Sequence, residues 1–237
     1  MNLSSVFGNE TPFGKFCAKA GAVILVNLLF ILTLIPIVTA GAGLCASYYC
    51  MLILVRDGEV SVFRTFWKSF KENFKQATIA WLVTIGLVLG LLIEYNITRQ
   101  MPSVFMICRV VVIAVLITVL LVAMYMGPVM SAFNGTLKQH FRNCLFFIGK
   151  NPLIAAAVAA ISAVPMVLTY VYYQWIPLTS FLWCFFGFGL TVYINAALLT
   201  PLFRNYLPGL SPVLAEEEET PRETEEQVRN DMIKLGM

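Results

Sequence analysis

Charged residues are scarce in this chain, and that scarcity decides its class. Only 12% of the 237 residues are Asp, Glu, Lys or Arg, while 59% are hydrophobic. A soluble domain carries about 25% charged residues, and a disordered chain is poor in apolar ones. The composition therefore excludes a soluble globule and a disordered chain, and it indicates an integral membrane protein.

Residues typical of catalytic and metal-binding sites are also few. The single histidine, His140, has no Asp or Glu cluster around it, and none of the six cysteines forms a Cys-x-x-Cys pair. Nucleophile motifs, glycine-rich phosphate loops and paired carboxylates within apolar stretches are missing as well. We therefore predict a protein that is not an enzyme and has no catalytic residues, metal site or cofactor. We expect His140 to be solvated or to lie at the level of the lipid headgroups, and the cysteines to be reduced. The net charge of +3 is modest and gives no indication of nucleic acid binding.

Four long stretches contain no charged residue: Ala20–Val55, Gln76–Ile93, Val110–Leu137 and Asn151–Phe203. A helix needs about 20 apolar residues to cross a bilayer. The first and last stretches are long enough for two spans each, reversing near Pro36–Gly43 and Tyr172–Pro177. We predict an all-α polytopic membrane bundle over residues 1–203, with spans near 20–37, 41–55, 77–94, 104–126, 153–171 and 178–200. The span at 41–55 is short, and a re-entrant or broken segment is the alternative there.

The basic residues predict the orientation, because loops on the cytoplasmic side are enriched in Lys and Arg. If both termini lie inside, Arg99 is the basic residue of the outer loops, and Arg109 lies just within the fourth span. The inner segments then hold Lys15, Lys19, Arg56, Arg64, Lys68, Lys71, Lys75, Lys138, Arg142, Lys150, Arg204, Arg222, Arg229 and Lys234. We therefore expect a multi-pass membrane protein with both termini in the cytoplasm.

Two segments outside the spans have aromatic and basic residues at helical spacing. Residues 61–76 carry neighbouring stripes made of Phe63, Phe66, Trp67, Phe70 and Phe74 and of Arg64, Lys68, Lys71 and Lys75. Residues 138–150 repeat the pattern more weakly. Such helices lie in the headgroup layer, where the bases meet anionic lipid. The 61–76 helix is either a docking surface for a cytoplasmic partner or a membrane-parallel connector.

Polar and small residues within the spans allow several roles. Glu94 and Arg109 lie near the outer end of one hairpin, so they form a candidate ion pair or snorkel separately. Gly86 and Gly90 form a GxxxG motif that permits close helix packing. Neutral polar residues either line a polar path or hydrogen-bond between helices; they are Asn27, Thr33, Thr39, Ser47, Tyr48, Thr191 and Asn195.

The tail at 204–237 differs from the rest of the chain. It begins with a segment that contains prolines and an acidic run, Glu216 to Glu219. Thr220, Pro221 and Glu223 form a capping box, which predicts a short cytoplasmic helix over 221–235.

The run LIPIVTAGAG at 34–43, Tyr48-Tyr49, LVRDGE at 54–59 and FRTFWKSFKENFKQAT at 63–78 resemble the YesL-like family of Gram-positive bacterial membrane proteins. The match covers residues 27–80 and includes a family-type turn with Pro36, Thr39, Gly41 and Gly43; Ala40 stands where the family often has Ile. The family has no known function, but its members are often encoded beside sugar ABC-transporter and sensor-kinase components. The resemblance therefore implies an accessory or regulatory protein associated with carbohydrate uptake or its sensing. The alternative is a small-solute transporter or channel with an outward vestibule near Glu94 and Arg109.

Overall fold

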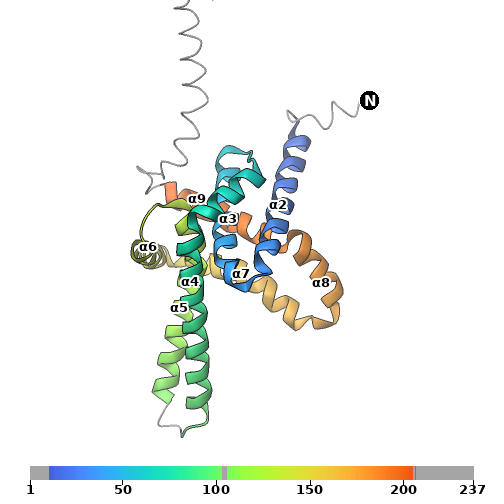
Figure 1. Ribbon diagram of the computed structural model, residues 1–237. Coiled ribbons are helices and arrows are strands. Elements are labelled where there is room, and N and C mark those ends of the chain that lie inside the picture. Colours follow the sequence, from blue (N-terminus) through green and yellow to red (C-terminus); the bar gives the residue numbers. More distant parts are fainter. Residues whose placement is uncertain (1–10, 103–105, 205, 207–237) are drawn as a thin grey trace, which may run out of the picture.

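The computed structural model describes residues 11–102, 106–204 and 206, and every regular element within them is a helix (Figure 1). Among the described residues, six helical segments are long and apolar enough to cross a membrane: Phe13–Leu34, Ile37–Asp57, Val62–Arg99, Met106–Ala132, Pro152–Val171 and Thr179–Arg204. The predicted all-α polytopic bundle is therefore confirmed. The predicted tail helix at 221–235 lies outside the described residues.

The first two spans form a tight helical hairpin. Helix α2 (Pro12–Leu34) begins earlier than predicted, because the Thr11 hydroxyl caps it by accepting the Gly14 N–H at 3.0 Å. It ends just before Pro36, and a single 3₁₀ turn, η1 (Ile37–Thr39), leads into α3 (Ala40–Asp57). Helix α3 is unbroken and packs against α2, α4, α5 and α9, so it is the central helix of the bundle.

The third span and the basic segment before it form one continuous helix, α4 (Val62–Arg99). The expectation that 61–76 is a separate surface helix is therefore wrong. The chain turns back after α3 at Gly58, whose φ of 83° favours glycine, but no Gly or Pro follows before Gly86. With nothing to break the helix, the amphipathic segment continues directly into the apolar one.

Helix α5 (Met106–Ala132) runs back beside α4, and the two form a hairpin that projects beyond the other helices (Figure 1). The Trp81 indole Nε1 of α4 donates to the Ile37 carbonyl at 2.9 Å, which places the α2–α3 turn level with the middle of α4. Helix α5 continues past the predicted end of its span, and its Gly127 lies against the ring of Tyr48 in α3.

The remaining helices complete the bundle. Helix α6 (Leu137–Lys150) is seen end-on in Figure 1 and therefore lies across the direction of α4 and α5. Helix α7 (Pro152–Val171) and a 3₁₀ turn, η3 (Tyr173–Trp175), precede the last span. That span consists of α8 (Ile176–Leu182), a π-helical turn, η4 (Trp183–Gly187), and α9 (Phe188–Arg204). Such π turns inside helices are rare and often mark functional sites.

Two apolar clusters form most of the core. The first joins α2, α3, the start of α4 and α9, and includes Val26, Met51, Leu54, Phe66 and Ala196. The second joins α5, α6, α7 and α9, and includes Tyr125, Val129, Phe147, Val158, Leu199 and Phe203. Helix α9 belongs to both clusters, so it holds the two halves of the bundle together.

Candidate functional site

The first candidate site is the amphipathic start of α4, residues 62–76, which we call the α4 arm. Its aromatic side chains do not face solvent together. Phe66 is fully buried against α3, and Trp67 and Phe70 pack beside it, with ring centroids 6.0 Å and 6.3 Å from that of Phe66. The interpretation of all five aromatics as a docking stripe is therefore wrong, because three of them fix the arm onto the core.

The opposite face of the α4 arm is basic and accessible. Arg64, Lys71 and Lys75 are exposed, and so are two aromatic side chains, Phe63 at 63% and Phe74 at 40%. Glu72 is the acidic residue on this part of the arm. Since the buried aromatics prevent the arm from rotating, the bases and the two outer rings are held in one orientation. Such a surface suits an acidic partner.

The family-type turn has a structural role that its residues explain. The Thr39 hydroxyl bonds to the carbonyls of Thr33 at 2.5 Å and Pro36 at 2.9 Å, which closes the turn. A Cβ at Gly41 would lie 2.6 Å from Trp81 Cβ, and one at Gly43 would collide with Thr33. The two glycines therefore permit α3 to approach α4 and α2 closely.

The predicted outer pair is not formed. The Arg109 guanidinium donates instead to the carbonyls of Met101 at 3.0 Å and Pro102 at 3.3 Å. Within the described part of the chain, the ion pair found joins Arg56 and Asp57. Arg109 thus ties the loop of its own hairpin, because neighbouring carbonyls are closer than the Glu94 carboxylate.

Gly86 and Gly90 do not mediate helix packing against any other described part of the chain. A Cβ added at either position would meet nothing within 4 Å, so both lie on the open face of α4. The predicted packing role is therefore wrong for contacts inside this protein. The motif was a weak signal because glycine spacing does not say which face of a helix meets a neighbour.

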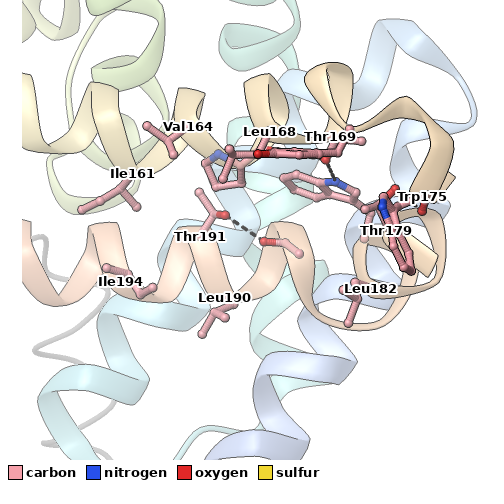
Figure 2. Close-up of a pocket in the computed structure, with 14 residues that line it drawn as sticks. Ile161, Val164, Leu168, Thr169, Trp175, Thr179, Leu182, Leu190, Thr191 and Ile194 are labelled. Atoms are coloured by element: carbon pink, nitrogen blue, oxygen red, sulfur yellow. Dashed lines mark hydrogen bonds between the residues drawn. The ribbon is translucent and has the colours of Figure 1, made fainter.

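The second candidate site is a groove between α7 and the last span, with a volume of about 670 Å³. Figure 2 shows side chains of the two segments facing each other across it. The lining residues labelled there are Ile161, Val164, Leu168, Thr169, Trp175, Thr179, Leu182, Leu190, Thr191 and Ile194. Sequence reasoning missed this groove; the threonines and tryptophans near the 172–177 turn were its only signal.

The chemistry of the groove is apolar. Its threonine hydroxyls already have partners, since Thr169 accepts the Trp183 indole N–H at 2.9 Å and Thr191 donates to the Gly187 carbonyl at 2.8 Å. The Thr179 hydroxyl donates to the Trp175 carbonyl at 3.1 Å, and none of the described residues that line the groove is charged. A sugar needs several unpaired polar partners in its site. The groove therefore suits an acyl chain or another apolar molecule.

Three of the neutral polar residues, Asn27, Tyr48 and Asn195, hydrogen-bond between helices, whereas Thr33, Ser47 and Thr191 donate to carbonyls of their own segments. The Asn27 amide of α2 donates to the carbonyls of Trp183 at 3.2 Å and Cys184 at 2.6 Å, and its oxygen accepts the Gly189 N–H at 2.8 Å. Asn195 of α9 donates to the hydroxyls of Tyr48 at 3.3 Å and Ser162 at 2.9 Å. Of the two interpretations from the sequence, these contacts favour interhelical bonding over a polar path.

His140 is buried rather than solvated. It lies on α6, outside the spans, with only 2% of its surface exposed, on the face that also holds Cys144 and Phe147. Burial lowers the pKa of His140 below its ordinary value of 6.5, and a hydrogen bond that the ring donates to the backbone of Gly135 opposes this only in part. The fold therefore holds His140 neutral, which the sequence did not reveal because His140 lies beside polar and basic residues.

This burial predicts a pH dependence of stability. Because the folded pKa is below the unfolded one, the folded state binds fewer protons, and stability is lost as the pH falls below about 6.5. We expect the unfolding temperature in detergent to fall between pH 7.5 and pH 5, and His140→Gln to flatten that profile. An identical pH profile for the two proteins in a thermal melt would contradict this prediction.

The fold as described is that of a multi-pass α-helical membrane protein. The model of a protein family described as "Protein of unknown function, DUF624" matches residues 23–95. This segment runs from α2 to near the end of α4, so it contains the turn and the α4 arm but not the groove of Figure 2. The YesL-like resemblance at 27–80 falls inside it. No curated protein and no solved structure matches the chain significantly.

Proposed function

We propose that the protein is a non-enzymatic accessory or regulatory protein of the bacterial cytoplasmic membrane that binds a partner through its α4 arm. The observation that supports this most directly is the fixed orientation of the arm. Phe66 is fully buried, while Arg64, Lys71 and Lys75 are exposed on the other side. Oriented charges raise the rate and specificity of association with a surface of opposite charge.

The nature of the partner follows from the same surface. Three bases with Phe63 and Phe74 beside them fit an acidic protein surface that offers an apolar pocket. With both termini placed in the cytoplasm by the positive-inside rule, the arm lies on the cytoplasmic side. The YesL-like resemblance then suggests a component of a sugar ABC transporter or its sensor kinase. The family-model match covers the arm, which agrees with a role located there.

A charge-reversal variant tests this proposal. We expect Arg64→Glu, Lys71→Glu and Lys75→Glu together to weaken binding of a co-expressed sugar ABC permease or sensor kinase at least tenfold, because each contact becomes repulsive. Binding would be measured by co-purification and by photocrosslinking from position 74. The buried aromatics are unsuitable for this test, since replacing Phe66 would damage the core.

A matched control separates the arm from net charge. Lys15→Glu, Lys19→Glu and Arg204→Glu change the charge equally and lie on α2 and α9, at the same end of the spans but not on the arm. The proposal predicts that this variant keeps its partner. Equal loss in both variants, or crosslinks from position 74 to lipid alone, would contradict it.

A further inference from the structure

A second groove lies on the other side of the molecule, between α4, α5 and α6, with a volume of about 540 Å³. Its walls are apolar over most of their length and include Val83 and Leu87 of α4 and Val119, Val122 and Met126 of α5. The first turn of α6 closes one end, where Phe141 and Lys138 line it. Lys138 is the charged residue in the lining, so the groove has one cationic end and one apolar end.

The cationic end offers more than one donor. Thr136 and Gln139 form a capping box at the start of α6, with the Thr136 N–H donating to Gln139 Oε1 at 2.7 Å. The box satisfies the Gln139 N–H through the Thr136 hydroxyl, so the N–H groups of Leu137 and Lys138 remain as the donors of the first turn, where the helix dipole favours an anion. The exposed ammonium group of Lys138 lies on the same turn. A phosphate at this end would therefore find both a charge and backbone donors.

The groove lies at the level in the membrane where the headgroup of a lipid meets its acyl chains. Its lining on α4 begins at Ala80, and Lys75 ends the basic stripe about 7 Å earlier along the helix. The cationic end therefore lies where α4 changes from basic to apolar, as expected at the boundary between headgroups and hydrocarbon. From Ala80 to Leu87 the groove follows α4 for roughly 10 Å. A packed transmembrane helix needs contact along roughly 30 Å, whereas part of one acyl chain fits.

We propose that this groove binds an anionic phospholipid, with one acyl chain between α4 and α5 and the phosphate held by Lys138 and the first turn of α6. The site is separate from the α4 arm and does not depend on the partner proposed for it. Bound lipid would join α6 to the α4–α5 hairpin, since it contacts all three helices at once.

The test uses the full-length protein, purified in a mild detergent and stripped of lipid. Phosphatidylglycerol and phosphatidylcholine with identical chains are added, the unfolding temperature is measured, and bound lipid is counted by native mass spectrometry. We expect phosphatidylglycerol to bind about fivefold more tightly, which corresponds to about 1 kcal/mol for one lysine near the headgroups. Equal binding of the two lipids would overturn the proposal, and so would equal stabilisation by inorganic phosphate alone.

Two pairs of variants locate the site. Lys138→Met should abolish the preference for phosphatidylglycerol, whereas Lys150→Met, at the other end of α6, should keep it. Val83→Phe should fill the groove and reduce binding of both lipids. Val111→Phe introduces the same ring at an equally exposed position, 55% in both cases, outside the groove, and should not reduce binding. Circular dichroism checks that each variant is folded. If either test variant behaves like its control, the site is elsewhere.

Discussion

Replacing Gly41 with alanine is expected to destabilise the bundle by about 3 kcal/mol, near the upper end for overpacking of a close contact. The added Cβ would lie 2.6 Å from Trp81 Cβ and 2.7 Å from the Ala77 carbonyl oxygen. The Ala77 carbonyl belongs to the backbone of α4, so a side-chain rotation cannot relieve the overlap. Helices α3 and α4 must move apart, which also strains the bond between Trp81 and Ile37.

Gly86→Ala is the matched control for this prediction. The substitution is chemically identical, but a Cβ at Gly86 meets nothing within 4 Å. We expect it to be neutral or to stabilise by up to about 1 kcal/mol, because alanine favours the helix more than glycine does. Reversible unfolding in mixed detergent, followed by circular dichroism, measures both variants. Similar losses for the two would show that the contact at Gly41 is not close.

Asn27→Leu is the other substitution with a large expected effect. Asn27 is fully buried and bonds to two carbonyls within the π turn of the last span and to one N–H just after that turn. Leucine keeps the volume but leaves the groups of Trp183, Cys184 and Gly189 without this partner. At about 1 kcal/mol for each lost bond, we expect a loss of about 3 kcal/mol.

The π turn provides the specific signature of this variant. Without Asn27, α-helical geometry becomes more stable than the π turn in the last span. The change would shift the groove residues on α8, on the far side of that turn. Asn96→Leu is the control, because Asn96 is exposed and donates only to the Leu92 carbonyl of its own helix. Stability in detergent, and spin-label distances between α2 and the 176–182 segment, would compare the two. Unchanged values in Asn27→Leu would refute the role of this side chain.

Most of the fold follows from the sequence because hydropathy and charge act over whole segments. Charge-free stretches of sufficient length specify the spans, and Pro36 and Pro152 stand near helix boundaries as their geometry requires. The α4 arm was identified as helical and amphipathic for the same reason. The sequence does not show that the arm continues into the third span, because a basic segment followed by an apolar one has the same pattern whether the helix continues or turns.

The candidate sites depend on contacts between segments distant in the chain, which periodicity does not report. An aromatic stripe has the same spacing whether it faces the core, as at Phe66, or faces outward. Arg109 donates to carbonyls next to its own helix, and His140 is buried because α6 packs against residues of other helices. The π turn and the groove of Figure 2 arise where Asn27 meets the last span, a contact 157 residues apart in the case of Cys184.

Helix α4 is one continuous helix, but its two halves have different surroundings. The helix carries the basic arm at one end and the projecting hairpin with α5 at the other, as Figure 1 shows. Its 38 residues extend about 57 Å. Because Phe66 fixes the arm to the core and Trp81 bonds to Ile37, α4 is held at its start and near its middle, and the half beyond Trp81 projects with α5. Bending of about 10° beyond Trp81 would displace the far end of α4, about 27 Å away, by about 5 Å without moving the arm.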